Sequence, residues 1–211
     1  INSLDTKNSE ILEDIEREAL ADNVPIIRRE MQSFLKVLLM VKKPMRVLEV
    51  GTAVGFSALL MSEYVPEECA ITTIENYEKR IPIARQNFVR AGKEKKITLL
   101  EGDAMDVLKT LEGPYDFIFM DAAKGQYIHY LPEILRLLAK GGILVSDNVM
   151  QDGDVIESRF AVERRDRTIH ARMREYLYEL KHNDALVTSI IPLGDGVALS
   201  VKKEVGTDIA Q

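Results

Sequence analysis

Four residues near the middle of the chain have types and a spacing that suit the binding of a hard cation. Asp121 and Lys124 follow one short apolar run, and Asp147 and Asn148 follow the next. Carboxylate and amide oxygens are ligands that Mg²⁺ and Ca²⁺ prefer and that suit zinc poorly. A cation held there stabilises the oxyanion of a chelated hydroxyl group, and Lys124 could take up the proton or stabilise that oxyanion. The alternative is two capping or buried aspartates and a surface lysine.

A glycine-containing loop and two acidic residues earlier in the chain point to a second ligand. Gly51 and Gly55 follow the acidic Glu49, but the third glycine of the dinucleotide fingerprint is missing, and no Lys or Arg is present to offset a pyrophosphate. Glu75 and Asp103 follow the next two apolar runs, where acidic side chains can accept hydrogen bonds from a ribose and an adenine. Singly, these features also fit a tight turn, a solvated strand end and a helix N-cap. Together they favour a nucleoside without phosphate, and S-adenosylmethionine fits this description.

The elements that position these residues alternate between short apolar strands and helices. Strands that begin about 19 to 26 residues apart, with helices between them, are typical of a parallel sheet with crossover helices on both faces. The predicted strands are Arg46–Val50, Ala70–Ile74, Ile97–Leu100, Phe117–Met120 and Ile143–Val145. The predicted helices between them are Phe56–Tyr64, Glu78–Ala91, Ala104–Leu111 and Ile128–Leu138.

Both ends of the chain depart from this alternation. Two amphipathic helices are predicted over residues 5–22 and Arg28–Val41. After residue 150 we expect a loop, a long helix over Val162–His182, and an antiparallel hairpin of Leu186–Ile191 and Val197–Lys202. The sequence therefore predicts a doubly wound α/β fold, with a mostly parallel seven-stranded sheet. We expect one domain over residues 1–211, with N-terminal helices (1–44), an α/β core (45–150) and a C-terminal part (151–203).

The composition excludes several classes of protein. The 211 residues carry a formal net charge of −6, and 46% apolar with 29% charged residues is the balance of a soluble globule rather than of a disordered chain. No apolar run approaches the ~20 residues of a membrane span, and no secretory leader is visible. The single cysteine, Cys69, and three scattered histidines exclude a Cys₂ or Cys/His zinc site. One cysteine cannot form an internal disulfide, which fits a reducing compartment. We therefore expect a cytoplasmic protein.

Six motifs, in this order, resemble those of the cation-dependent O-methyltransferases, the group that includes the catechol and caffeoyl-CoA O-methyltransferases. They are LEVGTAVGFSALLM (48–61), TIEN (73–76), GDA (102–104), FIFMDAAKGQY (117–127), SDNV (146–149) and PLGDGVALSVKK (192–203). The resemblance covers about residues 24–203. It implies a Rossmann-like class I methyltransferase sheet, S-adenosylmethionine as methyl donor, Mg²⁺ or another hard divalent cation, and a homodimer.

The resemblance also implies roles for individual residues. The implied donor contacts are Glu49, Gly51 and Ser57 for the methionine part, Glu75 for the ribose, Asp103 and Ala104 for the adenine, and Ile27 and Asp121 elsewhere in the site. The implied metal ligands are Asp121, Asp147 and Asn148. Lys124 matches the catalytic lysine of the family, and Asp121 belongs to the same catalytic set.

Within that family, VPI (24–26), DAAKGQY (121–127), DNV (147–149), an arginine-rich helix and IPLGDGVALSVKK (191–203) resemble the bacterial tRNA 5-hydroxyuridine methyltransferases. Residues 159–174 contain six arginines and two acidic residues, which gives this segment a charge of +4 in an otherwise acidic chain. Arginines bind phosphates and stack on unpaired bases, so Arg164, Arg165 and Arg167 are candidate contacts to a tRNA anticodon loop. The alternative is a solvated helix face with local ion pairs such as Glu163 with Arg167.

Three functions remain open on the sequence. In the first, the acceptor is 5-hydroxyuridine, whose hydroxyl lies beside a carbonyl oxygen and can chelate a metal as a catechol does. In the second, the acceptor is a small catechol-like phenol. In the third, the chain is a non-catalytic nucleoside-binding module that has lost its metal, and the presence of Asp121, Asp147 and Asn148 counts against it.

Overall fold

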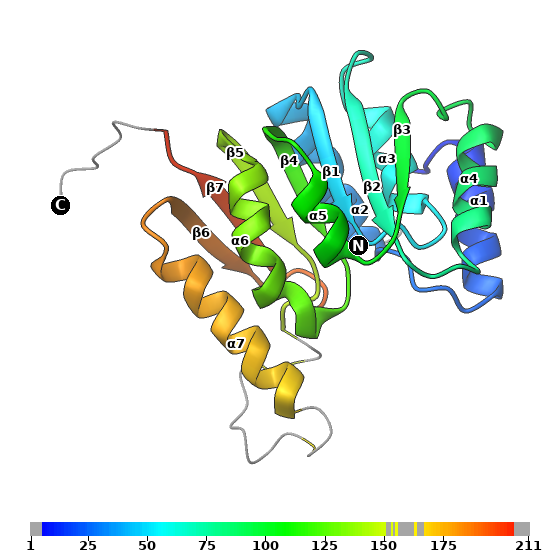
Figure 1. The fold of residues 1–211 in the computed structure, drawn as a ribbon. Coiled ribbons are helices and arrows are strands. Elements are labelled where there is room, and N and C mark those ends of the chain that lie inside the picture. Colours follow the sequence, from blue (N-terminus) through cyan, green and yellow to red (C-terminus); the bar gives the residue numbers. More distant parts are fainter. Residues whose placement is uncertain (1–5, 151–152, 154, 156–162, 164–166, 205–211) are drawn as a thin grey trace. The chain divides into compact units, whose positions relative to one another are not determined.

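Two compact units, residues 1–107 and 108–211, make up the chain. The structure is a computed structural model, and it describes residues 6–150, 153, 155, 163 and 167–204. The N-terminal unit contains three parallel strands in the order β3-β2-β1, which span Ile97–Glu101, Ala70–Glu75 and Arg46–Val50 (Figure 1). Because parallel strands end at the same edge, the residues that follow Val50, Glu75 and Glu101 lie at one edge of this part of the sheet.

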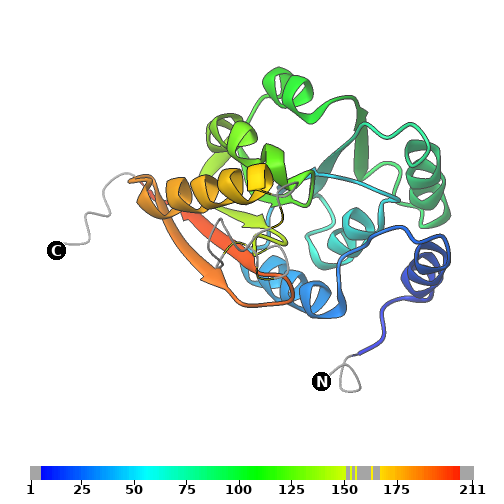
Figure 2. The same ribbon diagram turned by 90° about the horizontal axis from the view of Figure 1, so that it is seen from below.

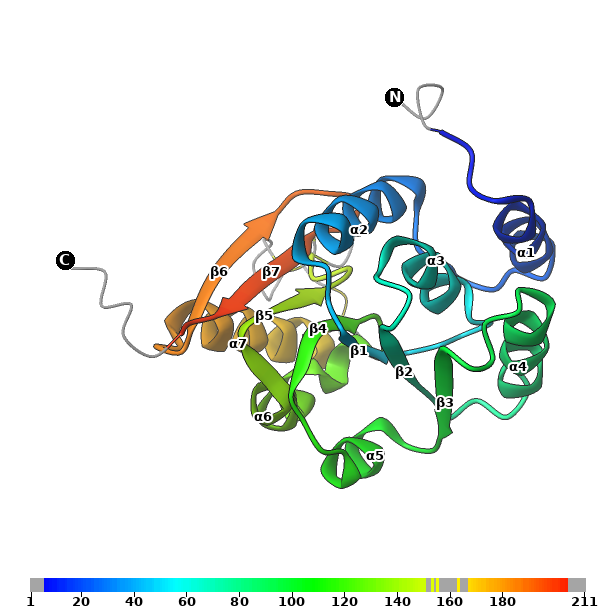
Figure 3. The same ribbon diagram turned by 90° about the horizontal axis from the view of Figure 1, so that it is seen from above.

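The N-terminal unit also contains helices. They are α1 (Glu10–Ala21), α2 (Arg29–Lys42), α3 (Phe56–Tyr64) and α4 (Ile81–Arg90), and α5 (Ala104–Thr110) begins in this unit. Helix α3 contacts β2 and β3 and is covered by α1 and α2, while α4 lies against β3 (Figure 3). Nearly every side chain of α3 is buried, since the helix is enclosed on both sides.

Among its described residues, the C-terminal unit contains four strands in the order β4-β5-β7-β6. They are β4 (Tyr115–Met120), β5 (Leu138–Ser146), β6 (Leu186–Ile191) and β7 (Val197–Lys202). The pair β4 and β5 is parallel, whereas β7 is antiparallel to both β5 and β6. The predicted terminal hairpin is therefore confirmed, with the predicted bounds.

Helical elements also belong to the C-terminal unit. The short 3₁₀ turn η2 (Lys124–Gln126) leads into α6 (Tyr127–Leu137), and α7 (Arg167–His182) comes before the hairpin. Helix α7 packs against β6, α6 and η2, and Figure 2 shows it alongside the hairpin. The buried face of α7 thus connects the hairpin to the turn that carries Lys124.

Several element boundaries differ from the prediction. Helix α1 begins at Glu10 rather than at residue 5, and β4 begins at Tyr115 rather than Phe117. Helix α4 begins at Ile81 rather than Glu78, with Pro82 in its first turn, where proline is tolerated. Strand β5 begins at Leu138, directly after α6, because Gly141 (φ 67°) and Gly142 allow a bulge where a loop was expected. A Cβ on Gly142 would lie 2.7 Å from the carbonyl oxygen of Ala139. The glycines therefore extend the strand instead of ending it.

The sequence predicted no membrane-spanning segment, and the helices that the structure describes can be compared with that prediction. None of those helices has both the length and the apolar character that a membrane crossing requires.

Candidate active site

The buried carboxylate of Glu49 links three elements of the N-terminal unit. One oxygen accepts a hydrogen bond from the Ser57 hydroxyl at 2.5 Å, and the other accepts one from the Thr73 hydroxyl. Ser57 lies in the first turn of α3 and Thr73 in β2, so the carboxylate fixes the start of α3 against the sheet. A buried carboxylate needs such donors. Contacts of Glu49 and Ser57 with the methyl donor stay predictions. The structure shows in addition that Glu49 positions the start of α3.

The loop after β1 follows a left-handed path that glycine permits. Its φ angles are 105° at Gly51, 47° at Ala53 and 85° at Gly55. A Cβ added to Gly55 would lie 2.5 Å from Cε1 of Phe88, so the loop also passes too close to α4 for any side chain at this position. The tight turn weighed in the sequence analysis is therefore present. The donor contact predicted for Gly51 stays a prediction.

The carboxylate of Glu75, at the end of β2, is held in place by backbone donors. It accepts the amide hydrogen of Ala53 at 2.7 Å and the amide hydrogens of Asn76 and Tyr77 at 3.0 Å and 2.9 Å. An ionised carboxylate has about four acceptor sites, so these three bonds leave capacity for a hydroxyl group. Glu75 therefore ties the glycine loop to β2 and fits the predicted contact with a ribose.

Asp103 caps the helix that follows β3. Its carboxylate accepts the amide hydrogen of Met105 at 2.9 Å, and its carbonyl oxygen accepts the amide hydrogens of Asp106 and Val107. The capping role weighed in the sequence analysis is therefore present. Contact of Asp103 and Ala104 with an adenine stays a prediction.

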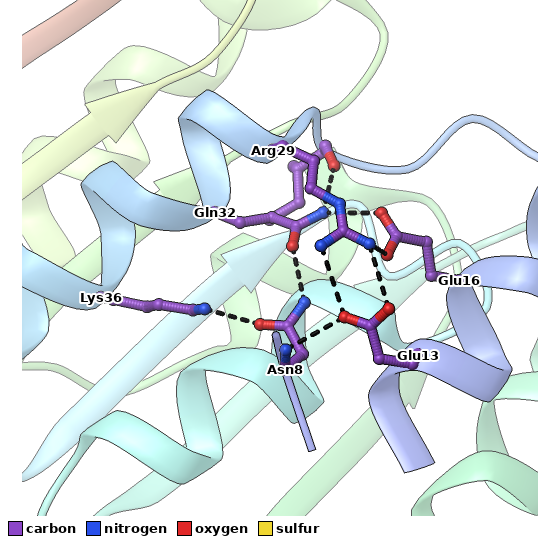
Figure 4. A network of polar contacts seen from close by, with 7 residues as sticks. Asn8, Glu13, Glu16, Arg29, Gln32 and Lys36 are labelled. Carbon is purple, nitrogen blue, oxygen red and sulfur yellow. Dashed lines mark hydrogen bonds and ion pairs between the residues drawn. The ribbon is translucent and has the colours of Figure 1, made fainter. Parts of the chain in front are cut away.

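A polar network holds the segment around Ile27. The buried Gln32 side chain donates to the carbonyl oxygen of Ile27 and to Glu16, both at 3.1 Å, and Arg29 pairs with Glu16 at 2.5 Å. A pocket of about 740 Å³ lies beside the network, and Ile27 forms part of its wall. The sequence did not anticipate the network, since its polar residues are spread over two helices. Figure 4 shows this network from close by, with labels on Asn8, Glu13, Glu16, Arg29, Gln32 and Lys36.

In the C-terminal unit, the two predicted carboxylate ligands follow paired residues of neighbouring strands. Met120 and Ser146 are partners in the parallel register of β4 and β5, and Asp121 and Asp147 come directly after them. The amide of Asp147 continues the ladder by donating to the carbonyl oxygen of Met120 at 2.9 Å. Asn148 has a left-handed φ of 54°, which asparagine tolerates better than most residues. The structure thus brings the three predicted ligands to one edge of the β4–β5 pair.

The two carboxylates influence each other electrostatically. Burial and the negative charge of Asp121 raise the pKa of Asp147 to about 7. Burial also raises the pKa of Asp121, and the positive charge of Lys124 opposes that shift. Asp147 is only 5% exposed, so water screens this repulsion poorly. A positive charge placed between the two groups would relieve it.

The donor set fits a hard divalent cation. In the part of the chain that the structure describes, no three His, Cys, Asp or Glu side chains are placed to hold a metal ion. A site here would therefore use the two carboxylates with the amide oxygen of Asn148, and the remaining positions would be open to water or to a substrate. Mg²⁺ is commonly bound in this way, by one or two carboxylates and several other oxygens.

Lys124 lies in η2, three residues after Asp121, and its ammonium nitrogen is 4.0 Å from a carboxylate oxygen of Asp195. Asp195 is buried in the loop between β6 and β7. The sequence analysis quoted this loop within a motif but assigned Asp195 no role. An acidic residue between two glycines in a hairpin loop was the signal available.

Part of the predicted arginine surface falls outside the described residues. Arg164 and Arg165 belong to that part, whereas Arg167 begins α7. Arg172, one turn further along, donates to the carbonyl oxygen of Gly125 at 3.2 Å. Arg174 donates to the carbonyl oxygen of Val155 at 2.9 Å. Helix α7 therefore brings the Arg172 side chain to the turn that contains Lys124.

Comparison with known proteins identifies similar sequences. A family model described as O-methyltransferase matches residues 2–203. A catechol O-methyltransferase of Niastella koreensis is 35% identical over 128 residues, which cover 59% of this chain and 58% of that protein. Caffeoyl-CoA O-methyltransferase 2 of Populus trichocarpa is 33% identical over 183 residues, which cover 79% of this chain and 70% of that protein.

Solved structures show the same fold. The SAH-bound methyltransferase of Podospora anserina superposes with a TM-score of 0.86 and 27% identity, over 96% of this chain and 92% of that one. The O-methyltransferase of Bacillus cereus in complex with SAH superposes with a TM-score of 0.85 and 25% identity, over 96% of this chain and 94% of that one. The predicted Rossmann-like α/β fold class is therefore confirmed.

Proposed function

The chain belongs to the O-methyltransferase family, and on that premise we propose that it uses S-adenosylmethionine and a hard divalent cation to methylate 5-hydroxyuridine at the wobble position of tRNA. Methyl transfer from S-adenosylmethionine to an oxygen atom is the activity that the family match and the curated relatives support. The cation and the tRNA acceptor go beyond the comparisons, and they rest on the residues described above. Such a reaction takes place in the cytoplasm, the location expected from the sequence.

One observation carries the proposal: Asp121 and Asp147 follow paired residues of β4 and β5, and the charge of Asp121 raises the pKa of Asp147. When both carboxylates are ionised they repel each other, and protonation of one or a cation bound between them relieves the repulsion. Asn148 supplies a third oxygen of the same hard type. This set is therefore best explained as a cation site.

The residues of the chain have distinct tasks in this reaction. When bound, the cation supplies positive charge that lowers the pKa of the acceptor hydroxyl, and the donor supplies a methyl group on a sulfonium. As a neutral amine, Lys124 would take up the hydroxyl proton at its Nζ atom; as an ammonium group, it would stabilise the oxyanion by its charge. Asp195 holds the ammonium group of Lys124 near that position. Glu75 accepts a hydrogen bond from the donor ribose, and Glu49 keeps α3 against the sheet.

The arginines support RNA as the acceptor. Arg172 of α7 bonds to the carbonyl oxygen of Gly125, the residue after Lys124, so a cationic helix borders the proposed catalytic turn. A wobble base is unpaired, so it can reach a site at this turn at little energetic cost. The vicinal oxygens of 5-hydroxyuracil suit chelation by a cation that leaves ligand positions open.

A small catechol-like phenol is the second candidate acceptor. The relatives from Niastella koreensis and Populus trichocarpa are named for catechol and caffeoyl-CoA, respectively. The net charge of −6 also favours a small acceptor over a polyanion. Both acceptors present adjacent oxygens, so the reaction at Lys124 is the same for either one.

The deciding experiment offers both acceptors to the purified protein. Radiolabelled S-adenosylmethionine and Mg²⁺ are incubated with tRNA that carries 5-hydroxyuridine, and in parallel with catechol or caffeoyl-CoA. We expect 5-methoxyuridine among the digested nucleosides, and a rate with tRNA at least about tenfold above that with the phenols. Methylation of the phenols alone would assign the acceptor to the second candidate.

A paired substitution separates RNA binding from the chemistry. Arg164→Glu with Arg165→Glu reverses two charges of the arginine-rich segment. We expect it to abolish tRNA methylation and to leave any slow methylation of catechol unchanged. Equal losses on both acceptors, or no loss on either, would contradict the RNA assignment.

A further inference from the structure

Tyr127 is a fully buried residue next to the proposed site, and its hydroxyl group lies among main-chain atoms of both aspartate segments. The residue begins α6, directly after the turn that contains Lys124. Its hydroxyl oxygen is 3.1 Å from the carbonyl oxygen of Met120 and 3.2 Å from that of Asp147. The same oxygen accepts the amide hydrogen of Ala122 at 3.3 Å. One phenol thus contacts the backbone of both strand ends.

These contacts surround the proposed metal ligands without touching their carboxylates. Met120 and Ala122 are the residues on either side of Asp121, and the third contact is the carbonyl group of Asp147 itself. A phenol is neutral at pH 7 and has one proton, so it donates to the two carbonyl oxygens in a shared bond while it accepts from Ala122. The hydroxyl therefore limits how far the two main-chain segments can separate.

We propose that Tyr127 is a positioning residue for the cation site, because its hydroxyl fixes the main-chain separation from which Asp121 and Asp147 reach one ion. The inference rests on the proposed cation site. Without this bridge, the repulsion between the two carboxylates favours a wider spacing, and a cation must then draw the segments together at the expense of binding free energy. Groups that orient metal ligands in this way typically change metal affinity by about 10- to 100-fold when removed.

Tyr176 provides a matched control. It is also fully buried, and its ring packs edge-on against that of Tyr127 at 5.4 Å between centroids. Its hydroxyl reaches the side chains of Ser146 (2.6 Å) and Met120 (3.9 Å) rather than the backbone beside the aspartates. Tyr127→Phe and Tyr176→Phe therefore remove the same atom from one buried cluster, and only the first removes the bridge.

Metal binding is the property to measure. Mn²⁺ and Mg²⁺ are titrated calorimetrically into the full-length protein and the two variants, without acceptor, and the affinity for S-adenosylmethionine is measured in parallel. For Tyr127→Phe we expect Mn²⁺ and Mg²⁺ dissociation constants at least about tenfold above wild type, with donor affinity unchanged. For Tyr176→Phe we expect metal binding within about twofold of wild type.

Each other outcome overturns the inference. If Tyr127→Phe binds the metal ions as tightly as wild type, the inference is contradicted while the proposed function stands. If metal binding weakens equally in both variants, the cause is a general loosening of the core and not the loss of the bridge. A wild-type protein that binds neither ion removes the cation site and this inference together. If Tyr127→Phe does not fold, amide exchange at Ala122 in the wild-type protein replaces it. Because coupling is reciprocal, Mg²⁺ must slow that exchange, and an unchanged rate contradicts the proposal.

Discussion

The ammonium nitrogen of Lys124 lies 4.0 Å from a carboxylate oxygen of Asp195, although the first residue follows β4 and the second lies between β6 and β7. The hairpin loop thus supplies a counter-charge to the proposed catalytic turn. The side chain of Lys124 is 30% exposed and that of Asp195 only 7%. The carboxylate is therefore the fixed member of the pair, and the ammonium group is the one that it orients.

Asp195→Asn is expected to lower activity more than stability. The pair is long and Lys124 is partly exposed, so we expect the free energy of unfolding to change by less than ~1 kcal/mol. The reaction rate is expected to fall about tenfold, because an ammonium group that is no longer oriented spends less time at the acceptor oxygen. Steady-state methylation and urea unfolding of the same samples check both. A loss of stability with an unchanged rate would assign Asp195 a structural role only.

Metal-free protein is expected to lose stability as the pH rises toward 8. The pKa of Asp147 is about 7 in the folded protein against an ordinary value of 3.8, so folding favours its protonated form. This contribution is fully present below about pH 4 and disappears as the pH passes through 7, with an upper limit of about 4 kcal/mol. Melting temperatures measured in EDTA from pH 5 to 8 should fall, and Mg²⁺ should restore them at pH 8.

The matched variant for that experiment is Asp147→Asn, which removes the charge. In EDTA it should be more stable than wild type at pH 8, and the difference should shrink at pH 5. Asp184→Asn, at an exposed position of the same unit, should show no such pattern. A pH profile of Asp147→Asn that is parallel to wild type would show that Asp147 does not bear the raised pKa.

Substitutions of Asn148 separate its oxygen from its backbone conformation. Asn148→Gly permits the φ of 54° and removes the side-chain oxygen, whereas Asn148→Asp keeps an oxygen and tolerates the same conformation. If Asn148 is a ligand, the glycine variant should bind Mg²⁺ at least about tenfold more weakly, and the aspartate variant should retain binding. Calorimetric titration distinguishes them, and equal affinities would remove Asn148 from the ligand set.

Gly55→Ala tests the close approach of the donor loop to α4. The new Cβ would lie 2.5 Å from Cε1 of Phe88, and the alanine would also have to keep the φ of 85°. We expect the free energy of unfolding to fall by about 2–4 kcal/mol, because the alanine is strained in a left-handed conformation and its Cβ overpacks against Phe88. Gly92→Ala is the control, since Gly92 has a φ of 63° with nothing within 4 Å of an added Cβ, and it should lose only about 1 kcal/mol. Urea unfolding measures both, and similar losses would mean that Phe88 moves aside at no cost.

Much of the fold was predictable because its signals are local. Apolar runs of strand length, helical periodicity and glycine positions all depend on residues close in sequence. These signals located the strand ends, and therefore Glu75, Asp121 and Asp147, within a residue of where the structure has them. They failed at Gly141 and Gly142, where glycines usually mark a loop but here permit a bulge within β5.

The contacts that shape the candidate site were decided by tertiary structure. Asp195 meets Lys124, and Tyr127 bridges Met120 and Asp147, only because separate strands pair and α6 packs beneath their ends. No periodicity encodes such contacts, since each depends on strand register, side-chain direction and burial together. The sequence by itself determined which chemical groups stand at the strand ends. The folded chain determined which of them meet, because long-range packing sets the distances on which charge interactions and ligand geometry depend.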